Sequence, residues 1–267
     1  MKKLSFLLLM FLSQLFFAQA NRFMYQVTMK PDSTDRSFVK TEVAYLDISA
    51  GKSLFYPENR LKRDSLFARM RQTKNFNFDR DQMQSLRSNL DFIIEKDYGT
   101  QKKMFKSRIA RDQFVYEEDR PMIWKILPET AKIGDYKAQK AETDFAGRKW
   151  FAWFTTEIPF QDGPYKFSGL PGLIVKVEDD KNDYSFDLKE TKKIPEMVAF
   201  DQRGSEITVK RSAFLKQQQQ FTSNPAQATA SFRGGGMRIQ ADPAQRKKME
   251  ERRKEEAQKN NNPIELK

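Results

Sequence analysis

The stretch Trp150–Glu178, WFAWFTTEIPFQDGPYKFSGLPGLIVKVE, is the densest run of aromatic residues, prolines and glycines in the chain. The alternation of residues from Lys149 to Ile158 predicts a β-strand, and Leu173–Val177 predicts a second. Between them, Leu170–Leu173 predicts a type II turn, because proline fixes a negative φ at its first central position and glycine allows a positive φ at its second. The stretch therefore predicts two strands joined by a tightly turned loop.

This stretch has two interpretations. In the first, it is a hairpin-like part of the core and its residues only pack. In the second, bare backbone and aromatic side chains line a groove for a ligand or partner, because glycine marks close backbone approach and Trp and Tyr are enriched at interfaces. The candidate ligand- or partner-binding residues of the second interpretation are Trp150, Trp153, Pro164, Tyr165, Phe167, Gly169, Leu170, Pro171 and Gly172.

The hexapeptide Gly169–Ile174 reads GLPGLI. It resembles the signature of the GLPGLI family, secreted or envelope proteins of Bacteroidetes-type bacteria with no established activity. The resemblance extends over the expected mature chain, as far as the Asn-Pro-Ile-Glu-Leu segment at 262–266. It implies an exported, β-rich protein and is compatible with a lipoprotein-carrier-like half-barrel, but it implies no function.

The N-terminus has the pattern of a secretory signal peptide. Two lysines precede an apolar run from Leu4 to Phe17, and Ala18-Gln19-Ala20 fits a cleavage site, so residues 1–20 are the expected signal. The apolar run is too short for a stable span, and no transmembrane segment is expected after cleavage. The expected location is periplasmic, outer-membrane-associated or secreted.

The chain contains no histidine and no cysteine. Ser-His-acid and Cys-His catalysis, disulfides and zinc sites built on those ligands are therefore excluded. No nucleotide-binding fingerprint is present, and we expect no catalytic residues, no metal and no cofactor. The acidic loop at 179–183 has Lys181 where calcium needs an oxygen ligand, so it predicts a hairpin loop. A carboxylate-only hydrolase using Glu157 and Asp162 is the enzymatic alternative.

The net charge is +12, and removal of the signal's two lysines would leave +10. Long-range attraction could bring such a protein into peripheral contact with an anionic envelope surface. The basic residues are spread along the chain, however, which also fits plain solubility. Nucleic acid is not an expected partner, because export separates the protein from it.

Short strand patterns recur about every ten residues, with no alternation of strands and crossover helices. The prediction is a mainly β (α+β) protein: a strongly curved antiparallel sheet or half-barrel, with helices from 57–90 and 205–221 packed against or beside it. The expected organisation is one domain over 21–221, a Gly-rich linker over 222–241, and a charged helical or disordered tail over 242–267. Ile264 and Leu266 could return as a short edge strand.

These features favour a non-catalytic exported binding or accessory protein of the cell envelope. It would hold an apolar, lipid-like ligand or an envelope protein in the curved sheet. The alternative is a structural or assembly partner of an outer-membrane complex, bound through 163–172 or a sheet edge.

Overall fold

The structure, a computed structural model, describes residues 19–75, 79–109, 112–200, 205–223, 251 and 259–266. Most of the expected signal peptide, Gly-rich linker and charged segment lies outside the described residues.

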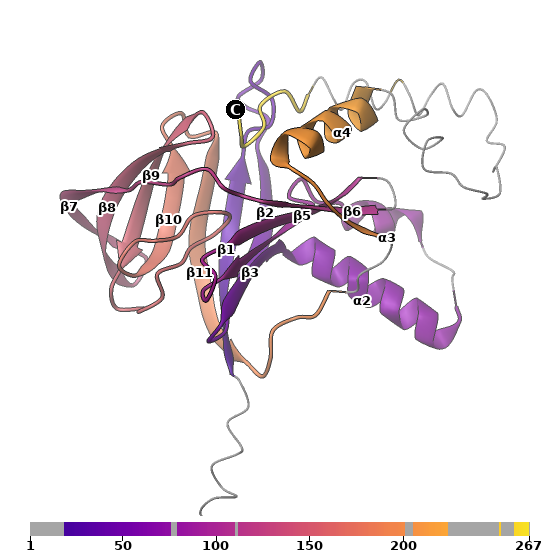
Figure 1. Ribbon diagram of the computed structural model, residues 1–267, viewed down its shortest axis with the longest axis horizontal. Helices are drawn as coiled ribbons and strands as arrows, with labels where there is room; N and C mark the ends of the chain where they lie inside the picture. Colours follow the sequence, from indigo (N-terminus) through magenta and orange to yellow (C-terminus); the bar gives the residue numbers. More distant parts are fainter. Residues whose placement is uncertain are drawn as a thin grey trace, which may run out of the picture.

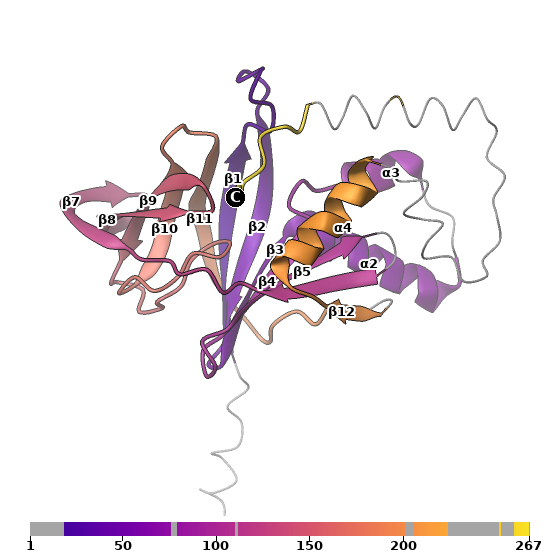
Figure 2. The ribbon, with the colours of Figure 1, turned by 45° about the horizontal axis from the view of Figure 1, so that its top comes forward.

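Within these described residues, the strands form one open sheet of 12. Figures 1 and 2 show its arrangement. Neighbouring strands are antiparallel except β12 and β6, which are parallel. Their order is β12-β6-β5-β4-β3-β2-β1-β11-β10-β9-β8-β7, and the prediction of a mainly β, antiparallel sheet is confirmed. The bounds are β1 Ala20–Met29, β2 Lys40–Ile48, β3 Lys52–Pro57, β4 Phe92–Asp97, β5 Lys103–Ile109, β6 Asp112–Glu117, β7 Lys125–Ile133, β8 Tyr136–Phe145, β9 Arg148–Thr155, β10 Leu173–Asp179, β11 Tyr184–Ile194 and β12 Glu206–Thr208.

The central strand β1 shows why period-two sequences form this sheet. Phe23, Tyr25, Val27 and Met29 are buried, and the residues between them are half-buried. A strand places alternate side chains on opposite faces, so one face of β1 belongs wholly to the core. The strand pairs with β2 on one side and β11 on the other.

The sheet is strongly bent around one hydrophobic core (Figures 1 and 2). A single cluster of buried side chains reaches from Phe114 on β6 to Ala141 on β8. Helix α4 (Arg211–Ser223) and the β9–β10 connection, residues 156–172, enter the same cluster through Phe214 and Phe167. The concave side of the sheet is therefore filled largely by the chain itself.

The remaining helices are α2 (Glu58–Thr73) and α3 (Arg80–Ser85), which confirms helical structure within 57–90. Helix α2 packs on β2 and β3, where Leu61 joins a small second cluster around Tyr45 and Tyr56. The helix expected over 205–221 begins at Arg211 instead, because residues 206–208 pair with β6 as strand β12.

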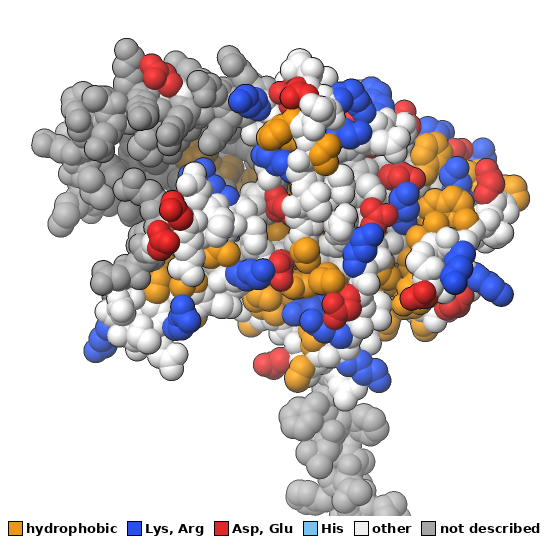
Figure 3. Space-filling model, turned by 180° about the vertical axis from the view of Figure 1, so that it is seen from behind, with side chains coloured by type: hydrophobic (Ala, Val, Ile, Leu, Met, Phe, Trp, Pro, Cys, Tyr) orange, Lys and Arg blue, Asp and Glu red, His pale blue; other side chains and the backbone are white. Residues whose placement is uncertain are grey.

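None of the helices that the structure describes is both long enough and apolar enough to span a membrane. On the face shown in Figure 3, basic side chains are dispersed among acidic ones. That distribution fits solvation of a basic surface and shows no single cationic patch there.

The predicted type II turn at 170–173 is wrong. The Gly172 N–H donates to Leu170 O at 2.8 Å, which closes a three-residue turn centred on Pro171. The Leu173 N–H, which a type II turn would aim at Leu170 O, instead donates to Ile158 O at 3.1 Å. Pairing with the segment after β9 therefore overrides the local turn preference.

Candidate ligand-binding cavity

The connection 156–172 is held inside the curved sheet by a buried ion pair. Lys96 on β4 donates through Nζ to Asp162 Oδ1 at 2.5 Å, and both side chains are almost wholly buried. The same ammonium donates to Gly163 O at 2.7 Å and Phe167 O at 2.9 Å. One lysine therefore binds both ends of the segment 162–167.

Asp162 is saturated with hydrogen bonds. Its carboxylate also accepts from Ser53 Oγ at 2.5 Å, Tyr98 OH at 2.6 Å and the Gly163 N–H at 2.6 Å. Glu157, the other carboxylate of the hydrolase alternative, is exposed and accepts from the Lys137 N–H at 3.0 Å. These contacts give Asp162 a structural role, as the counter-ion that fixes the loop.

A second buried lysine, Lys166, lies farther along the same connection. Its Nζ donates to Tyr116 OH at 2.9 Å, to Glu118 Oε2 at 2.6 Å and to Glu265 near the C-terminus. The ammonium also lies about 5 Å from the ring centroids of Phe105 and Tyr116. A buried charge needs such pairing and hydrogen bonding to offset its desolvation.

Residues 259–266 dock on the body by an irregular path, rather than as the expected edge strand. The buried Arg148 on β9 donates to Asn262 Oδ1 at 2.6 Å, Pro263 O at 2.7 Å and Ile264 O at 3.1 Å. Arg148 also forms ion pairs with Asp179 and Asp183. Both acids belong to the loop that was predicted as a hairpin rather than a calcium site. The confirmed β10–β11 hairpin thus orients the arginine that holds the tail.

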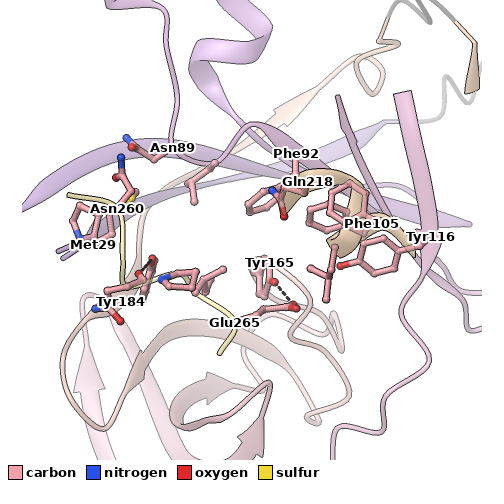
Figure 4. Close-up of a pocket in the computed structure, with 17 residues that line it drawn as sticks. Met29, Asn89, Phe92, Phe105, Tyr116, Tyr165, Tyr184, Gln218, Asn260 and Glu265 are labelled. Atoms are coloured by element: carbon pink, nitrogen blue, oxygen red, sulfur yellow. Dashed lines mark hydrogen bonds between the residues drawn. The ribbon is translucent and has the colours of Figure 1, made fainter. Parts of the chain in front are cut away.

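A cavity of about 360 Å³ lies between β4–β6, α4 and this docked tail (Figure 4). Its size is at the lower end of the range for small-molecule pockets, about 300–1,000 Å³. Four residues with amide side chains, Asn89, Gln218, Asn260 and Asn262, are among those that line it. Most of the remaining wall is apolar, and six aromatic rings contribute to it: Phe92, Phe105, Tyr116, Tyr165, Tyr184 and Phe214.

Of the nine residues predicted to bind a ligand or partner, Tyr165 lines this cavity. Two are exposed and Trp153 is half-buried, whereas the others are buried in the sheet and its loop. Their role in binding stays a prediction. The buried members are Trp150, Pro164, Phe167, Leu170 and Gly172, and the exposed ones are Gly169 and Pro171.

The rest of the cavity wall was not predicted from the sequence. Phe105 and Tyr116 lie on strands, and Phe214 on a helix, where an apolar residue is expected simply to pack. Ile264 is the exception among these lining residues, because an apolar residue in a polar C-terminal segment predicts that the segment packs back on the body.

The floor of the cavity is formed by Glu265, which points inward beside Tyr165 (Figure 4). One carboxylate oxygen, Oε1, accepts from Tyr165 OH and Lys166 Nζ. The other, Oε2, accepts from an Nη2 of Arg120 at 2.9 Å and of Arg211 at 3.0 Å. Burial acts to raise the pKa of Glu265, but Lys166 and these donors outweigh it, so the pKa is lowered. The floor is a well-formed carboxylate-binding site.

Beside this floor, Glu118 is a second buried carboxylate, and it pairs with Arg120 and Lys166. Arg120 binds it bidentately, Nε to Oε1 at 2.7 Å and Nη2 to Oε2 at 2.6 Å. Burial acts to raise the pKa of Glu118, but the hydrogen bond from Arg120 and the charge of Lys166 outweigh it and lower the pKa to about 2.

Glu118 is therefore expected to make stability depend on acid pH. Because its folded pKa lies below its ordinary value of 4.5, its contribution is complete above that value and is lost as pH falls toward 2. The contribution corresponds to about 3 kcal/mol. Urea unfolding of Glu118→Gln and the unsubstituted protein should differ most at pH 7 and converge between pH 5 and 2. A difference that does not change with pH would contradict this origin.

Comparison with known proteins gives a partial match. Residues 146–176 match a family described as "Protein of unknown function (Porph_ging)". The matched stretch contains the Gly169–Ile174 motif, and it covers a small part of the chain. No curated protein matches.

Among solved structures, PNGF-II in space groups P21 and C2 superposes with TM-scores of 0.53 and 0.52, at 14% identity in both cases. The alignments cover 74% of this chain and 33% and 32% of that one, so the chain spans about a third of PNGF-II. At this identity the likeness shows the fold alone. A domain assigned to an outer membrane lipoprotein-sorting protein of Vibrio parahaemolyticus covers 68% of this chain and 88% of its own, at 8% identity and a TM-score of 0.28, too low to support a common fold.

Proposed function

We propose that this chain is a non-catalytic, exported binding or accessory protein of the cell envelope, and that it holds the apolar part of a small ligand in the aromatic cavity. The observation that carries the proposal is the cavity of about 360 Å³, with its aromatic wall and few polar groups. Such a wall binds by burying apolar surface, while isolated amides fix orientation.

Because the concave side of the sheet is largely filled, the size of a possible ligand is restricted. Because residues 156–172 and α4 occupy much of the space under the sheet, a bulky multi-chain lipid would have to displace buried side chains. A single short apolar group fits the volume that is left. The N-terminal signal pattern and the GLPGLI resemblance support the envelope location.

The test is binding of N-phenyl-1-naphthylamine, an apolar dye that fluoresces on leaving water. Leu215 lines the cavity from α4 and is 38% exposed, so it lies at the cavity's rim, where Leu215→Trp adds bulk. We expect the variant to weaken dye binding about tenfold, equivalent to about 1.4 kcal/mol. Lys216→Trp is the matched control, because Lys216 is exposed on the same helix and does not line the cavity. Equal binding by both variants, or no dye binding by the unsubstituted protein, would reject the proposal.

One observation favours the assembly role as a second candidate. Strand β7 is an end strand of the sheet, and Ile123 and Ile126 beside or within it are 78% and 47% exposed. An exposed strand edge with apolar side chains can pair with a strand of a partner. Ile126→Lys should then weaken association with an envelope complex without changing dye binding in the cavity; unchanged association would remove this candidate.

A further inference from the structure

Four donors of the protein body converge on one carboxylate at the cavity floor, and that carboxylate belongs to the C-terminal tail. Tyr165 and Lys166 come from the β9–β10 connection, Arg120 follows β6, and Arg211 begins α4. All four donate to Glu265. The four donors therefore all come from the body, whereas the carboxylate that they bind comes from the tail.

The charges of this cluster favour an anion at the position of Glu265. Lys166, Arg120 and Arg211 are three cations, and Glu118 is the fixed carboxylate that pairs with the first two. Without Glu265, these three cations would lose a carboxylate that they share, which is unfavourable in a largely buried place unless another anion takes its position. Any carboxylate that reaches the same four donors can take that position.

The carboxylate also lies at the end of an apolar space. Glu265, Tyr165 and Tyr116 line the cavity, and the rings of Phe92 and Phe105 lie on its wall nearby (Figure 4). Phe214 also contributes to this wall. An amphiphile with one acidic head would fit both parts, with its chain among the rings and its head on the donors. The cations lie behind Glu265, so the head can reach them only by taking its place.

We propose that the cavity is a site for an apolar monocarboxylate, whose head group displaces Glu265 from Lys166, Arg120 and Arg211. This inference rests on the proposed function and adds the chemical class of the ligand. Displacement of Glu265 removes one of the contacts that hold residues 259–266 on the body. The remaining contacts include the hydrogen bonds from Arg148 and the bond from the Leu266 N–H to Ala146 O. Ligand binding is therefore coupled to loosening of the tail.

The test compares octanoate with 1-octanol, which has the same chain without the charge, by displacement of N-phenyl-1-naphthylamine. Glu265→Gln removes the competing carboxylate, so octanoate should bind about tenfold more tightly and octanol about as before. In the Glu265→Gln background, Arg211→Gln removes a donor without also weakening a competing carboxylate, and it should weaken octanoate about tenfold, again with little change for octanol. Lys210→Gln, an exposed neighbouring cation outside the cluster, is the matched control.

A second readout is hydrogen exchange. Saturating octanoate should speed exchange of the Leu266 amide in the unsubstituted protein, whereas octanol should not. The monocarboxylate site is overturned if both ligands respond alike to Glu265→Gln and Arg211→Gln. If neither ligand binds the unsubstituted protein, the proposed cavity function itself fails. Melting temperatures of each variant show whether it folds, and exchange of the Leu266 amide in the unsubstituted protein decides the question if Glu265→Gln does not fold.

Discussion

Gly172→Ala is expected to destabilise the fold by about 4 kcal/mol, the sum of overpacking and of a strained φ. Gly172 has a φ of +153°, and a Cβ there would lie 2.1 Å from Thr155 O and 2.6 Å from Thr155 C. Thr155 ends β9 and Gly172 directly precedes β10, so the clash involves two backbones that pair as neighbours in the sheet. Relief would require the strand ends to separate. Urea unfolding at pH 7 measures the loss.

Gly169→Ala is the matched control, because it is in the same motif and also has a positive φ, +93°, but no heavy atom within 4 Å of its Cβ position. Conformational strain alone should cost about 1–2 kcal/mol there. If the two variants lose the same stability, close approach at Gly172 is not the reason for the motif's second glycine. If Gly172→Ala loses much more stability than Gly169→Ala, the glycine at 172 in the GLPGLI motif is needed for the close approach of β9 and β10.

The strands could be predicted because their pattern is local. In β1, alternation from Phe23 to Met29 alone identifies the buried face. The turn at Pro171 and the start of α4 could not be predicted as well, because the Leu173 N–H and strand β12 find partners far away in the sequence. Local propensity decides only where no tertiary hydrogen bond competes for the same groups.

The candidate site was the least predictable part. Lys96 lies on a strand and Lys166 in a loop, positions where a lysine is ordinarily solvated. Their partners Asp162 and Glu265 are 66 and 99 residues away. A buried ion pair has no local sequence pattern, and neither has a cavity whose wall runs from Met29 to Glu265.

Lys96→Met is expected to cost about 4 kcal/mol, because removing one partner of a buried pair leaves the other charge uncompensated. The lysine is nearly inaccessible, and burial lowers its pKa, against the opposing effect of Asp162. Its loss also leaves the carbonyls of Gly163 and Phe167 without their ammonium donor. The connection 156–172 should loosen, which urea unfolding and faster amide exchange at Phe167 would show.

The double variant Lys96→Met/Asp162→Asn separates the charge from the packing. Neutralising Asp162 removes the unpaired carboxylate but keeps an acceptor for Ser53 and Tyr98, so the double variant should recover about half of the loss. Lys102→Met removes one partner of the exposed Lys102–Glu117 pair and should cost less than about 1 kcal/mol. Were Lys96→Met no more costly than Lys102→Met, the buried pair would not be what holds the loop under the sheet. Because that loop fills the concave side, the restricted size of the cavity would then need another cause.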